Sequence, residues 1–183
     1  MKTFVERPDE MAELERTLLP QRQNTRQKIF VLYGLGGIGK TQLAVEFARQ
    51  YHHKFSSVFW LDGGSEDNLK ISIARCASRI PVGQISNASR EYSTASGRDL
   101  DTVVAEVMGW LAQPDNTDWL VVFDNVDREY RPQTSDPLAY DVRQYLTGAD
   151  HGSILITTRL ARLEQLGASQ QLKRSTEYKR RRC

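Results

Sequence analysis

Short runs of apolar residues alternate along the chain with stretches in which apolar residues recur every three or four positions. The first pattern is typical of a strand buried on both faces, and the second of an amphipathic helix. Strands are predicted over residues 29–33, 57–61, 119–123 and 153–157. Helices are predicted over residues 11–18, 41–51, 65–80, 100–111 and 142–146, with a further short helix from Leu160.

This alternation predicts an α/β fold with three layers, in which helices cover both faces of a mostly parallel sheet of about five strands. Right-handed crossovers place the carboxyl ends of the strands along one edge, where ligands bind in open α/β sheets. We expect an N-terminal helix and linker over residues 1–27 that borders the site, a nucleotide-binding domain over residues 28–172, and a tail over residues 173–183. Residues 81–98, rich in Ser, Ala, Gly and Arg, predict a mobile loop.

Composition narrows the class of protein. The 183 residues suffice for one domain, and 39% hydrophobic with 26% charged residues is ordinary for a globular protein. No apolar run approaches the roughly 20 residues of a membrane helix, so we expect no membrane partner. Cys76 and Cys183 have neither metal-site nor disulfide-framework spacing, which favours a reducing, cytoplasmic setting.

The net charge of +2 is unevenly distributed. Residues 173–183 carry six basic side chains and one acid, so the tail is +5 and the other residues together are −3. The globular part therefore lacks the basic balance of a nucleic-acid-binding protein. We interpret the tail as a disordered, solvated end and expect no nucleic-acid partner.

The segment GLGGIGKT, residues 34–41, matches the phosphate-binding P-loop pattern G-x-x-x-x-G-K-[ST] through Gly34, Gly39, Lys40 and Thr41. It lies between a predicted strand and a predicted helix, as phosphate binding requires. Glycines allow positive φ angles, so that successive N–H groups can point at an anion, and the helix N-terminus adds partial positive charge. Lys40 would reach the β- and γ-phosphates and Thr41 would bind Mg²⁺. Additional glycines at positions 36 and 37 widen the loop.

A P-loop needs a carboxylate at the end of a neighbouring apolar strand, and Asp124 follows the run Val121 to Phe123. We predict that Asp124 binds Mg²⁺ directly or through water. Asn125 stands where many P-loop ATPases have a second acid, and an amide can orient water but cannot take its proton. Asp127 is a candidate substitute. We therefore expect ATP hydrolysis to be slow or absent in isolation.

The strand predicted over residues 153–157 is followed by Thr158 and Arg159. A guanidinium at the carboxyl end of a strand can contact a γ-phosphate. On the pattern alone, a surface arginine that merely follows a strand is an equally good interpretation.

Together these motifs resemble the NB-ARC domain of the STAND class of P-loop NTPases, which are signalling switches. GLGGIGKTQLA resembles the P-loop of that family, WLVVFDNVD its Walker B strand, and GSILITTR its sensor strand. The resemblance implies that Ile38 and Gln42 belong to the nucleotide site and that Arg159 senses the γ-phosphate. It also implies that the sensor strand lies between the P-loop and Walker B strands. FVERPDEMAEL resembles the N-terminal segment that packs over adenine, so Val5 and Arg7 would border the base.

Two positions depart from the family pattern. Glu6 replaces a glycine and Asn125 replaces an acid. After Gly167 we find neither the G-x-P motif nor the histidine-bearing winged helix of the family, and the three histidines lie elsewhere. We expect the chain to hold only the nucleotide-binding portion of such a switch.

The leading prediction is thus a domain that binds ADP or ATP with Mg²⁺ and acts as a switch with weak or no hydrolysis. Its partners would be the nucleotide and possible repeat or effector domains or other NB-ARC proteins. The alternatives are an active P-loop ATPase, a kinase-like enzyme, and a DNA-associated AAA+ ATPase that uses the basic tail.

Overall fold

The computed structural model describes residues 7–93, 97, 99–128, 136–146 and 148–173. Its centre is a sheet of five parallel strands in the order β2-β3-β4-β1-β5. The strands are β1 (Lys28–Tyr33), β2 (Ser57–Asp62), β3 (Trp119–Asp124), β4 (Ser153–Thr158) and β5 (Ala168–Gln171). The predicted α/β class and mostly parallel sheet are confirmed, and so is the position of β4 between β1 and β3.

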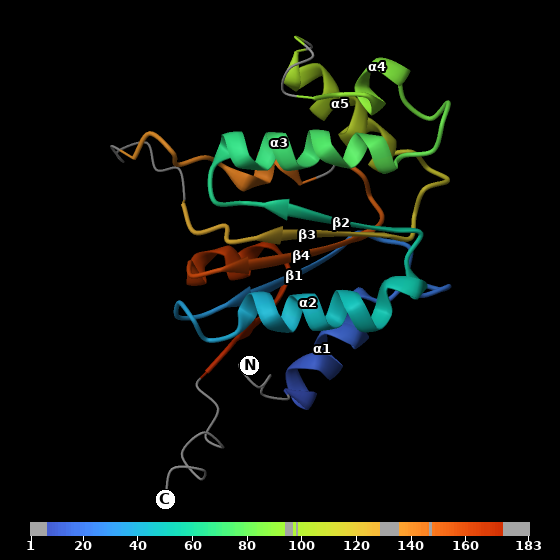
Figure 1. Cartoon of the computed structure of the whole chain (residues 1–183). Coiled ribbons are helices and arrows are strands. Elements are labelled where there is room, and N and C mark those ends of the chain that lie inside the picture. The colour runs from blue at the N-terminus through green and yellow to red at the C-terminus, as the bar shows by residue number, and fades with distance from the viewer. Residues whose placement is uncertain (1–6, 94–96, 98, 129–135, 147, 174–183) are drawn as a thin grey trace, which may run out of the picture.

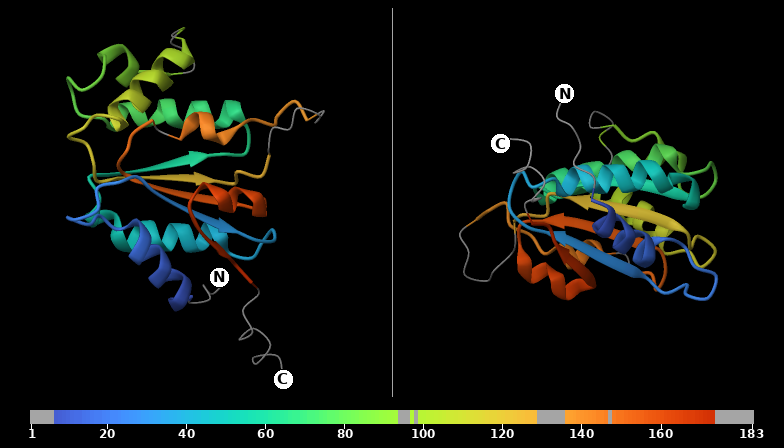
Figure 2. Two further views of the ribbon diagram at one scale, coloured as in Figure 1. Left: turned by 180° about the vertical axis from the view of Figure 1, so that it is seen from behind. Right: turned by 90° about the horizontal axis from the view of Figure 1, so that it is seen from below.

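Helices cover both faces of this sheet (Figure 1). The helices α1 (Pro8–Leu18) and α2 (Lys40–Tyr51) lie on one face, and α3 (Glu66–Cys76) and α5 (Leu100–Leu111) lie on the other. The same arrangement is seen from behind and from below in Figure 2. Shorter elements are α4 (Asn87–Arg90) and the 3-10 helices η1 (His52–Lys54), η2 (Ala77–Arg79), η3 (Val142–Tyr145) and η4 (Ala161–Leu166).

The alternation of side chains along each strand builds two cores. Phe30 and Leu32 of β1 pack with α1 and α2, whereas Val31 between them packs on the opposite face with α3 and α5. Because every residue of β3 and β4 is buried, both strands read as continuous apolar runs in the sequence. Leu14 and Leu18 of α1 are fully buried, so this helix completes the core on its face.

Local side-chain chemistry sets the helix starts. The Ser65 hydroxyl accepts a hydrogen bond from the backbone N–H of Asn68, and Asp99 caps α5 in the same way through Thr102. Pro8 occupies the first turn of α1, where its missing N–H costs no hydrogen bond.

Other expectations need correction. The helix that starts after Ser65 ends at Cys76 and continues as η2, and the predicted helix near residue 142 is the 3-10 helix η3. Within the predicted mobile loop, residues 81–93 hold α4 and a bridge between Val82 and Ile85, whereas residues 94–96 and 98 lie outside the described residues. The hydrophobic pattern does not predict the strand β5, because its sequence, ASQQ, has no apolar run. Among the described residues, no helix has the length and apolarity needed to cross a membrane. Of the predicted tail, residues 174–183 lie outside the described residues.

Candidate functional site

The segment that joins β1 to α2 is a glycine-rich loop at the carboxyl edge of the sheet, where the strand arrowheads point at the left of Figure 1. Three of its glycines have positive φ, namely Gly34 at 148°, Gly37 at 73° and Gly39 at 99°. Residues other than glycine rarely adopt these backbone angles. In addition, a Cβ on Gly34 would lie only 2.7 Å from the carbonyl oxygen of Leu172. The loop therefore has the backbone that the P-loop pattern predicts.

Lys40 begins α2 and is 8% exposed. Its Nζ donates hydrogen bonds to the carbonyl oxygens of Gly34 at 2.8 Å and Leu35 at 2.9 Å, so it lies across the inside of the loop. Burial lowers the pKa of Lys40 from its ordinary value, and the charge of Arg159 lowers it further. Asp127 and Asp124 act in the opposite direction and favour the charged form.

Asp124 ends β3 and is 6% exposed. Its Oδ1 accepts a hydrogen bond of 2.8 Å from the Thr41 hydroxyl at the start of α2. The same oxygen accepts a hydrogen bond from the Thr157 hydroxyl of β4. Thus three elements that are far apart in the sequence converge on one carboxylate.

The donor set near Asp124 suits Mg²⁺ bound together with a phosphate ligand. Within the described chain there is no group of three His, Cys, Asp or Glu side chains that could hold a metal alone. Mg²⁺ is commonly bound through one or two protein oxygens with water and phosphate oxygens completing the shell. The adjacent oxygens of Thr41 and Asp124 provide such a pair.

Asn125 has a φ of 61°, the left-handed conformation that Asn tolerates better than most residues. Its N–H donates to the Thr157 hydroxyl at 3.0 Å, and its Nδ2 donates to Asp124 Oδ2 at 3.3 Å. The residue therefore turns the chain away from β3 and holds the Asp124 carboxylate.

Arg159 follows β4 and lies beside the loop. Its side chain is 66% exposed, and its Nε forms an ion pair of 3.0 Å with Asp127. A Cβ built on Gly36 would lie 3.3 Å from Cζ of Arg159, so the guanidinium rests against that glycine. The predicted candidates Lys40, Asp124 and Arg159 thus gather at one edge of the sheet.

The N-terminal segment also reaches the loop. Arg7 Nη2 donates to the carbonyl oxygens of Ile38 and Lys173, each at 3.1 Å, and Nη1 pairs with Glu10. Gln42 Oε1 lies 3.6 Å from a Cβ built on Gly39. Val5, the other residue predicted to border the base, lies outside the described residues.

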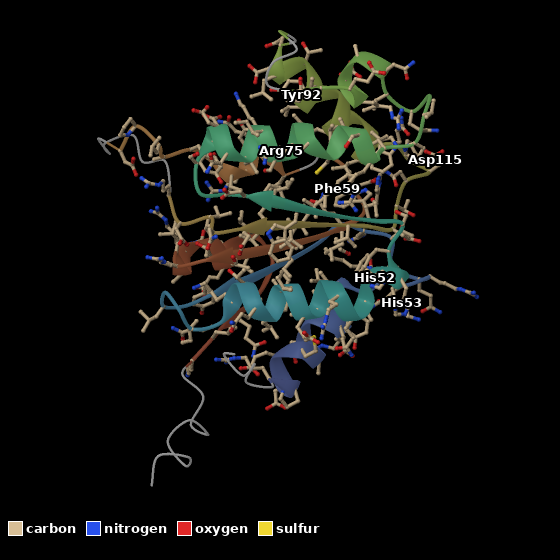
Figure 3. The ribbon with its side chains drawn as sticks, viewed as in Figure 1. His52, His53, Phe59, Arg75, Tyr92 and Asp115 are labelled. Atoms are coloured by element: carbon tan, nitrogen blue, oxygen red, sulfur yellow. The ribbon has the colours of Figure 1, made fainter. Side chains whose placement is uncertain are left out.

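Sequence reasoning missed Thr157, whose hydroxyl joins Asp124 to Asn125. The available signal was two adjacent threonines at the end of an otherwise apolar strand. The histidines, by contrast, lie away from this site. His52 and His53 follow α2 at the opposite end of the molecule (Figure 3), and His151 precedes β4, next to Trp119.

The fold resembles that of a protein of solved structure. Cdc6p from Pyrobaculum aerophilum superposes with a TM-score of 0.61 at 16% sequence identity, over 94% of this chain and 46% of that one. The chain has the fold of a P-loop NTPase.

A curated protein also resembles this P-loop NTPase in sequence. It is a nucleotide-binding leucine-rich repeat (NLR)-like protein from Hyaloscypha variabilis, 23% identical over 164 residues. The match covers 85% of this chain and 16% of the relative, so this chain spans about a sixth of the length of that protein. No protein-family model matches the sequence.

Proposed function

We propose that this P-loop NTPase binds ADP and ATP with Mg²⁺ and serves as the nucleotide-binding part of an NB-ARC-type signalling switch. The observation that carries the proposal is the 2.8 Å contact between Thr41 Oγ1 and Asp124 Oδ1 beside the glycine-rich loop. It brings the two oxygen donors that Mg²⁺ would use to the start of the helix whose N-terminus would hold the phosphates.

Each part of the site has a defined task in nucleotide binding. The loop N–H groups would surround the phosphates, and Lys40 would exchange the carbonyls of Gly34 and Leu35 for phosphate oxygens. Thr41 and Asp124 would hold Mg²⁺, which supplies positive charge to the phosphates when it is bound. Arg7 contacts Ile38 and would border the adenine side of the site together with Val5.

Distinction between ADP and ATP is the central property of a switch, because a ligand shifts a conformational equilibrium only by its differential affinity. Arg159 lies next to Gly36 and carries the charge that a γ-phosphate would contact. ADP would favour one state of the attached domains and ATP the other.

Weak hydrolysis follows from the residues around Asp124. Asn125 cannot accept a proton from water, and both oxygens of Asp127 bond to Arg159. Asp62 at the end of β2 is similarly occupied by the N–H of Gly64 and the amide of Asn68. None of these groups is a free base next to the loop.

The assignment to a switch rather than a metabolic enzyme rests on the resemblance of the four motifs to NB-ARC domains and on the NLR-like relative. Repeat or effector domains, or other NB-ARC proteins, are the partners that fit this assignment. The buried free thiol of Cys76 agrees with a cytoplasmic setting.

Calorimetric titration with Mg-ADP and with a non-hydrolysable Mg-ATP analogue tests the proposal. Lys40→Ala should abolish binding of both because the loop loses its full positive charge, whereas Lys54→Ala, at an exposed position of η1, should bind like the wild type. Circular dichroism would establish that Lys40→Ala is folded. Absence of binding to the wild-type chain would refute the proposal.

A further inference from the structure

The segment after β3 is tied to the segment after β4. The Val126 N–H donates to the Thr157 carbonyl at 3.0 Å, and the Val126 carbonyl accepts a hydrogen bond from the Thr158 hydroxyl. Val126 is 1% exposed, so this junction is part of the core. The next residue, Asp127, is therefore presented from a firmly held backbone.

Asp127 holds Arg159 at two points. Its Oδ1 accepts the backbone N–H of Arg159 at 2.7 Å, and its Oδ2 pairs with Nε at 3.0 Å. One carboxylate thereby restrains both the backbone and the guanidinium of Arg159, whose side chain is 66% exposed. A flexible, solvated arginine loses much rotamer freedom when it is held in this way.

The guanidinium as a whole lies beside the loop, since a Cβ built on Gly36 would be 3.3 Å from Cζ and 3.4 Å from Nε of Arg159. Within the part of the chain that the structure describes, no hydrogen bond is found to the two terminal nitrogens of Arg159. Nη2 lies 3.4 Å from a Cβ built on Gly36. Asp127 thus occupies the Nε side and leaves four N–H donors available next to the glycine-rich loop.

We propose that Asp127 is a positioning residue for nucleotide discrimination, which holds Arg159 against the loop so that its terminal nitrogens meet a γ-phosphate. This inference rests on the proposed nucleotide binding and adds the residue that sets the preference between triphosphate and diphosphate. It replaces the interpretation of Asp127 as a substitute for the missing second acid.

Asp127 has a second influence of opposite sign. As a negative charge near Lys40 it repels phosphate, so its removal alone would strengthen binding, and more so for ATP than for ADP. The two effects separate in a double-mutant cycle with Arg159→Ala. An effect exerted through Arg159 disappears in that background, whereas a direct charge effect persists.

The experiment measures dissociation constants of Mg-ADP and of a non-hydrolysable Mg-ATP analogue for the wild type, Asp127→Asn, Arg159→Ala and the double variant. In Asp127→Asn, the amide oxygen can still accept the backbone N–H of Arg159, so the chain should fold. The amide NH₂ that replaces the second oxygen cannot accept a hydrogen bond from Nε. Asp127→Ala serves as a second variant that removes both bonds.

We expect Asp127→Asn to lower the affinity for the ATP analogue relative to ADP by about fivefold, and to change ADP affinity by less than about twofold. In the Arg159→Ala background, the same substitution should change the ratio of the ATP-analogue affinity to the ADP affinity by less than about twofold. An unchanged or increased preference for the ATP analogue in Asp127→Asn, or an equal change in both backgrounds, overturns the role of Asp127. Failure of the wild type to bind either nucleotide would instead refute the proposed function.

Discussion

The guanidinium of Arg159 rests against Gly36, so the end of β4 and the glycine-rich loop meet without an intervening side chain. A Cβ on Gly36 would lie 3.3 Å from Cζ and 3.4 Å from Nε and Nη2 of Arg159. Such a Cβ would be closer than most Cβ atoms come to their neighbours, but the opposing atoms belong to the end of the flexible Arg159 side chain. Gly36 therefore determines how closely Arg159 approaches the loop.

Gly36→Ala should displace Arg159 by a few tenths of an ångström while the fold is preserved. We expect the affinity for a non-hydrolysable ATP analogue to fall about threefold relative to ADP, since the guanidinium must leave its preferred rotamer. Calorimetric titration with both nucleotides measures the ratio. If the same substitution lowers the ratio equally in an Arg159→Ala background, the contact is not responsible.

Thr41→Val removes the hydroxyl that contacts Asp124 and keeps the shape of the side chain. The gain in ADP affinity on adding Mg²⁺ should shrink by about tenfold, because one of the two predicted metal oxygens is lost. Titrations with Mg²⁺ and with EDTA measure this gain. Thr41→Ser retains the oxygen and should behave like the wild type, and a Thr41→Val protein with a full Mg²⁺ effect would exclude Thr41 as a ligand.

Asn125→Asp would place an acid where Asn125 now holds Asp124. Asp tolerates the left-handed conformation nearly as well as Asn, so the turn should persist. We expect steady-state ATP turnover to rise at least about tenfold, since a correctly placed base commonly contributes more than that. Asn125→Gly keeps the conformation without an acid and should not exceed the wild-type rate. Equal rates in all three proteins would show that the missing acid does not limit hydrolysis.

Gly152→Ala tests the core rather than the site. Gly152 has a φ of 83°, and a Cβ there would lie 2.3 Å from the ring of Trp119. Overpacking and backbone strain together should lower stability by about 3 kcal/mol, or about 10 °C in melting temperature. Gly148→Ala is the matched control, because nothing lies within 4 Å of its added Cβ. A wild-type melting temperature for Gly152→Ala would contradict the packing.

Much of the fold was predictable because buried strands and helix faces are apolar in the sequence. All six residues of β3 and of β4 are buried, so both strands are apolar runs whose polar ends mark the sheet edge. The strand β5 left no such record, since its four residues, Ala168 to Gln171, lie at the sheet edge and are mostly exposed. Its position depends on backbone pairing with β1, which side-chain patterns do not report.

The sequence predicts which residues gather at the candidate site, but not how they pair. Lys40, Thr41 and Asp124 follow from local motifs, because strand ends and a glycine-rich turn suffice to bring them to one edge. The pairing of Asp127 with Arg159 joins positions 32 residues apart on the chain, and only the adjacency of β3 and β4 creates it. The left-handed turn at Asn125 is likewise invisible in composition, although Asn is a residue that permits it.

The position of β4 also has a consequence for how the chain is made. The P-loop strand and the Asp124 strand are synthesised first, yet they are not neighbours, since the strand between them emerges only with residues 153–158. A nascent chain that has passed Asp124 therefore holds the β2–β3 pair and a separate β1, and such unpaired strand edges favour aggregation. Because Thr157 and Arg159 belong to β4 and the residue after it, the proposed nucleotide site can be complete only once this strand has joined the sheet.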